Sequence, residues 1–449
     1  MREFDVVVMG AGAAGEVVAG RLGERGLAVA VVEERLVGGE CSFYACMPSK
    51  ALLRPVELRA EAMRVRGLRV GELDVPTVLE RRDEVVHDLD DSLMLPWLSE
   101  RGVTLLRGRA ELVGERRVRV GEEELVARRA VVVATGSAPF LPPVPGLADA
   151  RPWTNVEATT ASEPPGRLLV IGGGPVAVEL ALAWSGLGSE VVLLERGERL
   201  LAREEPFAGE QVRDGLARAG VDVRLGAEAA RVTRNGSVRV ELQGGGTVEG
   251  DELLVATGRT PRTAGIGLEA VGLAGGGFLE VDESLRVGGR DWLYAVGDVN
   301  GRALLTHMGK YQGRLAADAI LGREVRLRSD GGRSPRVVFS DPQVGAVGHT
   351  LASATGAGLR ARAVDVETGG NAGGSFVGKN APGTSRLVVD EGRRVVAGAT
   401  FTGAEIAEAL HAATIAVVAE VPLDDLWHAV PAFPTRSEAW LRLLEAYGL

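Results

Sequence analysis

The sequence predicts an α/β protein in which one strand–turn–helix–strand unit occurs twice. Two glycine-rich turns, each between an apolar strand and an alanine-rich helix, carry this prediction, and so do two later strands that both end in Ala-Thr-Gly. With 449 residues, the chain has room for about two to four domains with buried cores.

The first unit lies at the N-terminus, where residues 4–33 read FDVVVMGAGAAGEVVAGRLGERGLAVAVVE. A β-branched strand at residues 4–9 leads into Gly10-x-Gly12-x-x-Gly15, and a helix, a second strand at residues 27–32 and Glu33 follow. The first glycine allows a tight turn, and the second lets a pyrophosphate approach the backbone. The third allows the helix to pack closely on the strand. This segment therefore predicts a nucleotide site.

The second unit spans residues 167–195, which read RLLVIGGGPVAVELALAWSGLGSEVVLLE. Gly172-x-Gly174-x-x-Ala177 follows a strand, and Glu195 follows the first glycine at the same interval as in the first unit. Free backbone N–H groups and the helix dipole would hold phosphates, while the carboxylate accepts hydrogen bonds from a ribose. Two such units predict two Rossmann-like dinucleotide-binding domains and two nucleotide cofactors.

A second repeat supports this organisation. Residues 131–139 read VVVATGSAP and residues 253–261 read LLVATGRTP, so both strands end in Ala-Thr-Gly where a nucleotide domain would finish. Thr135, Gly136 and Gly258 are therefore candidate cofactor-binding residues.

Composition limits the partners. The formal charge of −10, with 25% charged and 45% hydrophobic residues, argues against nucleic acid and against an anionic membrane surface. The start of the chain lacks a signal-peptide pattern, and no apolar run approaches the roughly 20 residues of a membrane helix. We expect a cytoplasmic protein.

The two cysteines, Cys41 and Cys46, lie in the stretch GGECSFYACMPSK. A zinc site normally needs four ligands and no histidine is nearby, so a redox-active pair is favoured. On a regular helix their Cα atoms would be roughly 8–9 Å apart, whereas a disulfide needs about 7 Å or less. Cys41 must therefore precede the helix, or its first turn must be distorted, which Pro48 would permit. A flavin between a nicotinamide and such a disulfide makes chemical sense, because both exchange electron pairs.

At this point the whole chain resembles the flavin-dependent pyridine nucleotide–disulfide oxidoreductases, the family of dihydrolipoamide dehydrogenase, glutathione reductase and mercuric reductase. The family loop reads Gly-Gly-Thr-Cys, four residues, Cys-x-Pro-Ser-Lys. This sequence matches it at Gly38, Gly39, Cys41, Cys46, Pro48, Ser49 and Lys50. It departs from it at Glu40, where Thr is usual, and at Ala45, where Gly is usual.

The resemblance implies a division into domains. It gives an FAD-binding domain in two segments, 1–147 and 266–330, an NAD(P)H-binding domain at 148–265, and an α+β interface domain at 331–449 that makes a homodimer.

The resemblance also implies roles. Cys41 corresponds to the interchange thiol that meets the substrate, and Cys46 to the charge-transfer thiol beside the flavin. Lys50 corresponds to the lysine near flavin N5, which also makes it a cofactor contact, and Glu179 to the carboxylate partner of that lysine. Asp298, in Tyr-Ala-Val-Gly-Asp, corresponds to the aspartate that holds the ribityl chain of FAD.

The nicotinamide cofactor is expected to be NADH. Glu195 favours the free 2′-hydroxyl of NADH, because its charge would repel a 2′-phosphate. Arg196 and Arg199 follow closely and could bind that phosphate, so NADPH remains the alternative.

The C-terminal segment departs from the family at one catalytic position. The family motif is His-Pro-Thr-x-Ser-Glu, whose histidine serves the partner subunit's thiols as acid–base, and this chain reads Phe433-Pro-Thr-Arg-Ser-Glu438. Phenyl cannot move protons; we interpret the nearby His428 as a packing or surface residue, with replacement of the missing acid–base as the alternative. Thr435 and Glu438 precede an apolar run and predict a helix capping box. The chain also lacks the additional C-terminal cysteine pair of mercuric reductases and the C-terminal thiol or selenol pair of large thioredoxin reductases.

Three functions stay open from the sequence. In the first, hydride passes from NADH through FAD to the Cys41–Cys46 disulfide and on to a small disulfide or similar acceptor. In the second, electrons leave the flavin directly to a quinone or dye. In the third, the chain is a flavoprotein subunit without turnover. The physiological acceptor and the role of Glu40 do not follow from the sequence.

Overall fold

The computed structural model describes residues 1–449. Contacts between residues divide the chain into two compact units, and each unit is assembled from three separate segments. The first unit contains Met1–Pro48, Asp83–Phe140 and Arg259–Gly331. The second unit contains Ser49–Arg82, Leu141–Gly258 and Gly332–Leu449. The domain boundaries expected from the sequence remain predictions.

The first unit is built on a seven-stranded sheet in the order β3-β2-β1-β6-β5-β4, with β16 paired to β6. Its strands are β1 (Arg2–Met9), β2 (Val29–Glu33), β3 (Val103–Arg107), β4 (Ala110–Gly114), β5 (Arg117–Val120), β6 (Glu123–Val133) and β16 (Leu293–Ala295). Strands β3, β2, β1, β6 and β16 pair in parallel, whereas β4, β5 and β6 form an antiparallel meander. A short antiparallel pair, β7 (Ser137–Pro139) with β15 (Arg259–Pro261), completes the strands of this unit.

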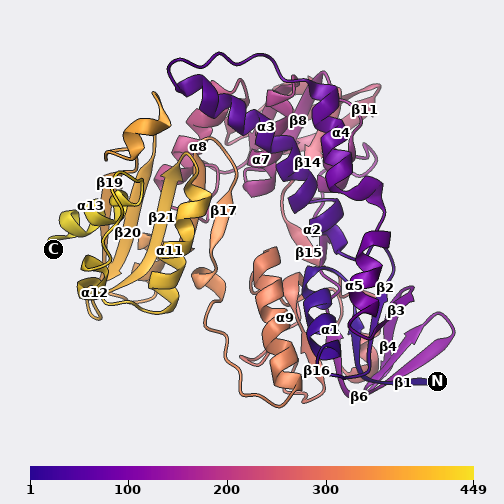
Figure 1. The fold of residues 1–449 in the computed structure, drawn as a ribbon. Coiled ribbons are helices and arrows are strands. Elements are labelled where there is room, and N and C mark those ends of the chain that lie inside the picture. The colour runs from indigo at the N-terminus through magenta and orange to yellow at the C-terminus, as the bar shows by residue number, and fades with distance from the viewer. The chain divides into compact units, whose positions relative to one another are not determined.

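Both faces of the first sheet are covered, so β1 is buried on both sides. Val6 and Val8 point into one apolar cluster, and Val7 and Met9 into the other. The helices of this unit are α1 (Ala13–Gly23), α2 (Gly39–Phe43), α5 (Leu95–Ser99) and α9 (Thr306–Ile320). α1 packs against α9, and Figure 1 shows the two helices side by side. The carboxyl ends of β1, β2 and β6 meet at one edge of the sheet, where parallel sheets place their ligand sites.

The second unit contains a four-stranded parallel sheet in the order β10-β9-β8-β14. Its strands are β8 (Arg167–Ile171), β9 (Glu190–Glu195), β10 (Asp222–Leu225) and β14 (Glu252–Val255). An antiparallel sheet is formed by β11 (Ala229–Asn235), β12 (Ser237–Leu242) and β13 (Thr247–Gly250). The helices of this part are α3 (Cys46–Arg64), α4 (Val75–Val85), α6 (Asn155–Thr160), α7 (Pro175–Gly186) and α8 (Pro206–Arg218); α3 and α4 each cross a boundary between the two units.

The rest of the second unit is an antiparallel sheet of five strands in the order β17-β18-β21-β20-β19, with helices packed on it (Figure 1). The strands are β17 (Arg336–Val338), β18 (Gln343–Gly348), β19 (Ala361–Glu367), β20 (Thr384–Asp390) and β21 (Val395–Gly403). The helices are α10 (Leu351–Gly356), α11 (Ile406–Val418), α12 (Leu423–Trp427) and α13 (Glu438–Tyr447). The predicted fold class, two Rossmann-like domains followed by an α+β domain, is confirmed.

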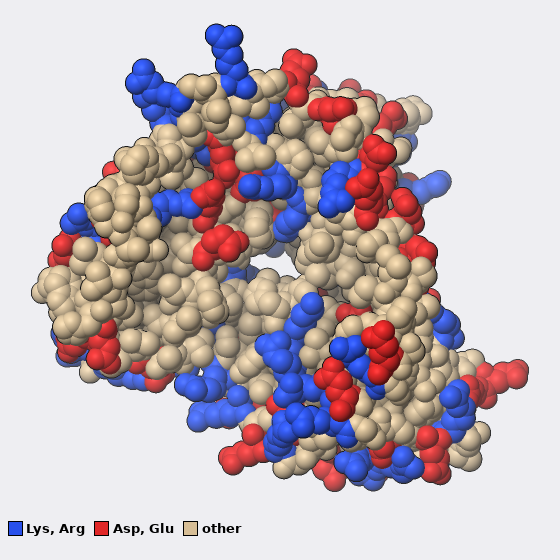
Figure 2. Space-filling model, in the orientation of Figure 1, with Lys and Arg blue, Asp and Glu red and all other residues tan.

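The surface shows no separation of charge on the face drawn in Figure 2, where acidic and basic side chains are interspersed. No helix combines the length and the apolar character that crossing a bilayer requires.

Candidate active site and nucleotide sites

The first glycine motif holds three chain segments at very short distances. Gly10 has a φ of +106°, and a Cβ built on it would lie 2.5 Å from the carbonyl oxygen of Ala134, which follows β6. A Cβ on Gly15 would lie 2.0 Å from the carbonyl oxygen of Gly10. Only glycine fits at these two positions without moving the backbone. The motif therefore brings β1, α1 and the end of β6 together. The backbone N–H groups in the first turn of α1 have no acceptor within the helix and can bind a phosphate.

Glu33, at the end of β2, is fixed beside this turn. Its Oε2 accepts a hydrogen bond of 2.8 Å from the N–H of Ala11, and its Oε1 accepts one of 2.8 Å from the N–H of Arg35. A cavity of about 480 Å³ opens here. It is lined, among others, by Gly10, Gly12, Glu33, Glu40, Cys41, Thr135, Gly136 and Asp298. The glycine turn, the helix N-terminus and a carboxylate at a strand end are what a dinucleotide requires, so the residues present fit FAD.

Asp298 lines another part of this cavity, which we call the glycine-loop cavity. It follows β16 in a short turn, and its Oδ2 accepts a hydrogen bond of 2.5 Å from the hydroxyl of Ser137. Burial raises the pKa of the Asp298 carboxyl, while the Ser137 hydrogen bond and the charge of Arg259 act in the opposite direction. The hydroxyl of Thr135 donates to the carbonyl of Arg262 at 2.7 Å, which ties the Ala-Thr-Gly turn to β15 and its continuation.

The second glycine motif repeats this backbone arrangement. Gly172 has a φ of +126°, and its Cβ would lie 2.5 Å from the carbonyl oxygen of Ala256. Ala177 is buried in α7, and a Cβ on Gly174 would meet no atom within 4 Å, which leaves room in front of the turn. The Oε1 atom of Glu195, at the end of β9, accepts a hydrogen bond of 2.6 Å from the N–H of Gly197.

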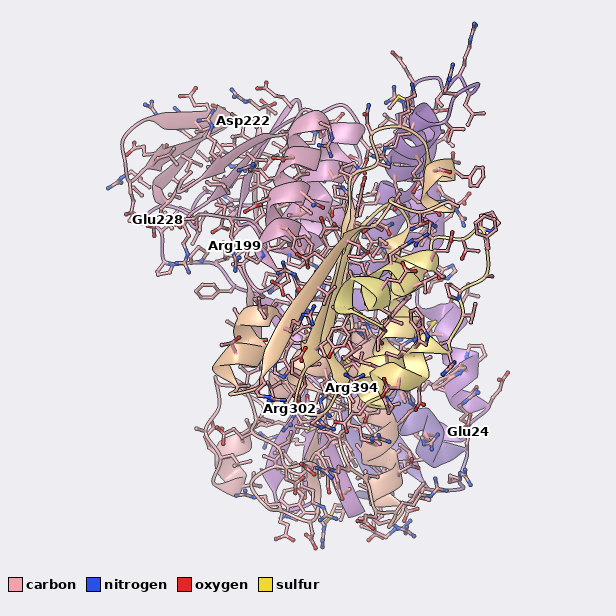
Figure 3. The ribbon with its side chains drawn as sticks, turned by 90° about the vertical axis from the view of Figure 1, so that its left-hand side faces the viewer. Glu24, Arg199, Asp222, Glu228, Arg302 and Arg394 are labelled. Atoms are coloured by element: carbon pink, nitrogen blue, oxygen red, sulfur yellow. The ribbon has the colours of Figure 1, made fainter.

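Two arginines and a glycine complete the surroundings of this second site. Arg196 is exposed, and Arg199 donates a hydrogen bond of 2.8 Å to the carbonyl of Ala202 (Figure 3). Gly258 has a φ of +144° with open space at its Cβ position. The residues of this site fit a dinucleotide.

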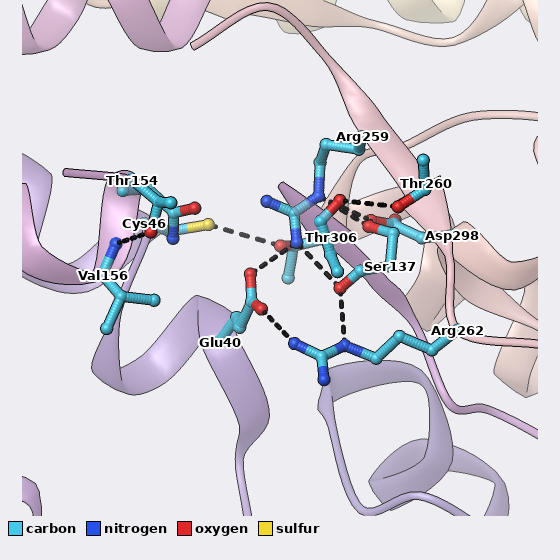
Figure 4. Close-up of polar contacts among 12 residues, drawn as sticks. Glu40, Cys46, Ser137, Thr154, Val156, Arg259, Thr260, Arg262, Asp298 and Thr306 are labelled. Atoms are coloured by element: carbon cyan, nitrogen blue, oxygen red, sulfur yellow. Dashed lines mark hydrogen bonds and ion pairs between the residues drawn. The ribbon is translucent and has the colours of Figure 1, made fainter. Parts of the chain in front are cut away.

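The two thiols lie on either side of a helix break. Cys41 belongs to the short helix α2, Tyr44 leaves the helical conformation with a φ of −134°, and Cys46 begins α3. The irregular chain path predicted from the cysteine spacing is thus present. Neither cysteine is in a disulfide, and the pKa of Cys41 is raised, first by its hydrogen bond to Cys46 and then by burial. Cys46 Sγ also lies 3.3 Å from the hydroxyl oxygen of Thr306 (Figure 4).

Lys50 and Glu179 meet in the second unit, although 129 positions separate them in the sequence. The Nζ atom of Lys50 lies 2.6 Å from Oε2 of Glu179, whose side chain is 8% exposed. The other carboxylate oxygen accepts a hydrogen bond of 3.0 Å from the N–H of Phe339, and the Lys50 ammonium lies 4.8 Å from the centre of the Phe339 ring. The pairing expected from the resemblance is present, while its role in hydride transfer stays a prediction.

Glu40 has partners that the sequence did not suggest. Its two carboxylate oxygens accept hydrogen bonds from the guanidinium groups of Arg259 and Arg262 (Figure 4). Both arginines line the glycine-loop cavity. A signal was available: the second Ala-Thr-Gly strand continues Arg-Thr-Pro-Arg, whereas the first continues Ser-Ala-Pro-Phe.

The C-terminal motif differs from its predicted geometry. Phe433 is 77% exposed in the protomer, and His428 is exposed just after α12. The capping box predicted for Thr435 and Glu438 is wrong. α13 begins only at Glu438, the hydroxyl of Thr435 donates to the carbonyl of Ala432, and no side chain caps the helix.

Comparison with known proteins agrees with this geometry. Residues 4–314 match the family model described as pyridine nucleotide-disulphide oxidoreductase, and residues 334–444 match the dimerisation domain of that family. The chain is 31% identical to a glutathione reductase from Burkholderia cepacia over 98% of each protein. It is 30% identical to a dihydrolipoyl dehydrogenase from Chlamydia muridarum, over 97% of this chain and 95% of that one.

A mercuric reductase from Staphylococcus aureus is also 30% identical, over 97% of this chain and 81% of that protein. Among solved structures, the HOCl-induced flavoprotein disulfide reductase RclA from Escherichia coli aligns with a TM-score of 0.86 and 26% identity, over 98% of this chain and 99% of that one. LpdA from Mycobacterium tuberculosis aligns over the full length of both chains with a TM-score of 0.87 and 25% identity.

The dimerisation-domain match supports the predicted homodimer. The chain belongs to the pyridine nucleotide–disulphide oxidoreductase family, whose members are enzymes that use FAD and NAD(P)H to act on disulfides.

Proposed function

We propose that this enzyme takes hydride from NADH and delivers the electron pair through FAD to the Cys41–Cys46 pair, which then reduces a small disulfide. The observation that carries this proposal is the contact between the two thiols, of which Cys41 also lines the glycine-loop cavity. FAD supplies the two-electron relay between nicotinamide and sulfur. The net reaction consumes NADH, a proton and one acceptor disulfide, and yields NAD⁺ and two thiols.

The thiols have different tasks in this scheme. We assign Cys41 to the attack on the acceptor, because it lines the glycine-loop cavity, and Cys46 to the contact with the flavin; the hydrogen bond to Cys46 raises the pKa of Cys41. Thr306 lies within hydrogen-bond distance of the Cys46 sulfur. Cys41, once deprotonated, attacks the acceptor and releases one thiol; Cys46 then attacks Cys41, which restores the disulfide and releases the second thiol.

Glu179 and Lys50 supply charge near the reaction and do not react with sulfur themselves. The buried carboxylate holds the Lys50 ammonium in one position through a hydrogen bond of 2.6 Å. Lys50 lies four residues after Cys46 in α3, one helical turn further on. We assign it the task of holding positive charge beside the flavin while hydride is transferred.

Phe433 limits which disulfides we expect the enzyme to reduce. A general acid–base contributes about 10²–10⁴-fold to a proton-dependent step, and this chain has a phenyl group at the motif position. A leaving thiol of low pKa needs less protonation. We therefore propose acceptors of that kind, such as aromatic disulfides, over aliphatic ones.

An anaerobic titration of the holoenzyme with NADH tests the electron path. The expected result is uptake of two hydride equivalents, with a long-wavelength thiolate–flavin absorbance band after the first, and alkylation of both cysteines in the reduced protein. Uptake of one equivalent without that band, with both thiols unreactive, would overturn the proposal. Cys46→Ser is the matched variant and should take up one equivalent without the band.

A second candidate function is direct transfer from flavin to a quinone, and Phe433 favours it because quinone reduction does not use the missing histidine. Under this alternative, the double variant with Ser at positions 41 and 46 keeps its NADH-dependent quinone reduction. Loss of that activity in the double variant would exclude it. Membership in a family of enzymes argues against the third hypothesis, a flavoprotein subunit without turnover.

A further inference from the structure

Glu40 places a negative charge in a cavity that has to receive phosphates. It lies in α2 directly before Cys41, lines the glycine-loop cavity, and its side chain is 18% exposed. Its Oε2 accepts a hydrogen bond from Nη2 of Arg259, and its Oε1 accepts one of 3.0 Å from Nη2 of Arg262. The Glu40 carboxylate therefore forms ion pairs with both arginines at once.

Both arginines are held on the cavity wall by groups other than Glu40. The Nε atom of Arg259 donates to the Ser137 hydroxyl at 2.6 Å, and its Nη2 donates to the Ser137 carbonyl at 3.0 Å. The Nε atom of Arg262 donates to the same carbonyl at 2.9 Å. Both guanidinium groups therefore have a second anchor, at Ser137, that does not involve Glu40 (Figure 4).

The positive charges of this cluster face carboxyl groups of the chain itself. Glu40 pairs with both Arg259 and Arg262, and Asp298 lies 3.7 Å from Arg259. The pyrophosphate of an FAD held by the glycine motif would add negative charge to the same cavity, and guanidinium groups bind phosphate oxygens as well as they bind carboxylates. Glu40 and the pyrophosphate therefore compete for the same donors.

We propose that Glu40 is an internal competitor of the FAD pyrophosphate: it neutralises Arg259 and Arg262 in the flavin-free protein and, when FAD is bound, weakens the hold of the cavity on it. The flavin of this enzyme then exchanges with free FAD instead of being held permanently. The inference rests on FAD as the cofactor and not on which acceptor the enzyme reduces.

The test is the rate at which the holoenzyme releases FAD, followed as the rise in flavin fluorescence on dilution. Glu40→Gln keeps the shape and one acceptor oxygen but removes the charge. We expect FAD release about 10-fold slower than in the wild type at low salt, with the ratio shrinking at high salt because screening weakens charge repulsion. Glu40→Thr, the residue of the family loop, should act in the same direction and serves if Glu40→Gln folds poorly.

If Glu40 helps to bind FAD, its replacement should change the rate of FAD release in the opposite direction. If Glu40 serves to position the arginines for FAD, both variants release FAD faster than the wild type, and that result, or an unchanged rate, overturns the proposal. Glu24→Gln is the matched control, because it removes an ion pair of 2.8 Å with Arg101 beyond the far end of α1 (Figure 3). It should release FAD at the wild-type rate. Since release is measured without NADH or acceptor, the outcome does not depend on the proposed electron path.

A double-mutant cycle sharpens the result. Arg259→Gln in the wild-type background removes one donor to the phosphates and leaves Glu40 with less neutralisation, so FAD release should accelerate strongly. In the Glu40→Gln background the same substitution removes only the donor, and the acceleration should be several-fold smaller. Equal acceleration in both backgrounds would show that Glu40 and Arg259 act independently and would overturn the competition.

Discussion

A Cβ on Gly10 and a Cβ on Gly172 would each lie 2.5 Å from the carbonyl oxygen of an alanine, Ala134 in the first motif and Ala256 in the second. The two motifs share this backbone, yet their surroundings differ. Gly15 is followed by the half-buried Glu16, whereas Ala177 is followed at the matched position by the buried Val178. One backbone frame therefore supports two environments, with a carboxyl group after the third small residue of the first motif and an apolar side chain at the matched position of the second.

The largest expected effect comes from replacing the first glycine of each motif, because both motifs need it for the same backbone turn. Gly10→Ala forces a Cβ onto a backbone carbonyl at a φ of +106°, so we expect loss of FAD and a destabilisation of roughly 3 kcal/mol or more. Gly172→Ala should keep FAD but lose reduction of the flavin by NADH by about 100-fold or more. Flavin content and stopped-flow reduction report the two outcomes separately.

Gly71→Ala is the control for these two variants, because its Cβ meets no atom within 4 Å, and it should behave as the wild type. If Gly172→Ala lost its FAD as readily as Gly10→Ala, the two motifs could not be serving separate nucleotides.

A smaller effect concerns Glu16, which has no counterpart in the second motif. Burial raises the pKa of Glu16 from 4.5 to about 7, with the charge of Glu33 adding to the rise and that of Lys310 opposing it. The folded state thus holds this proton more tightly than the unfolded state does. Its contribution to stability is complete below about pH 4.5 and is lost as the pH rises through about 7, a change of roughly 3 kcal/mol.

Glu16→Gln should remove this dependence. Measured by urea unfolding between about pH 4.5 and pH 8, the free energy of unfolding of the variant should exceed that of the wild type increasingly as the pH rises. Parallel profiles for the two proteins would mean that Glu16 is charged in the folded state at neutral pH.

The smallest expected effect lies in the second motif. Glu195 is the group that would repel a 2′-phosphate, so Glu195→Gln should raise the ratio of kcat/KM for NADPH over NADH by about tenfold, or about 1.4 kcal/mol. Glu198→Gln, an exposed acid three residues on, should leave the ratio unchanged. A wild-type enzyme that already prefers NADPH would contradict the assignment of NADH.

Short-range patterns predicted most of the frame. The strand expected at residues 4–9 is β1, Arg2–Met9, and the strand expected at residues 27–32 is β2, Val29–Glu33, so type and order were correct and the bounds shifted by two residues at most. Glycine turns and strand runs are encoded within a few residues, which is why they can be predicted without the rest of the chain.

The site was harder to predict, because several of its side chains contact residues that are far away in the sequence. The local pattern Thr435-x-x-Glu438 predicted a cap, but Glu438 is buried and its carboxylate accepts a hydrogen bond from the N–H of Gly373, 65 positions away. Glu40 finds Arg259 at a separation of 219 positions. The pairing of Lys50 with Glu179 was expected only because a family resemblance supplied it.

The burial of β1 on both faces has a consequence for its register. A slip by one residue along Val6, Val7 and Val8 would exchange one valine for another in each core, so these side chains cannot specify how far the strand advances between its neighbours. Gly10 can specify it, because a slip would bring a residue with a Cβ to the position that demands a φ of +106°. The smallest residue of the segment is thus the one that sets its alignment in the sheet.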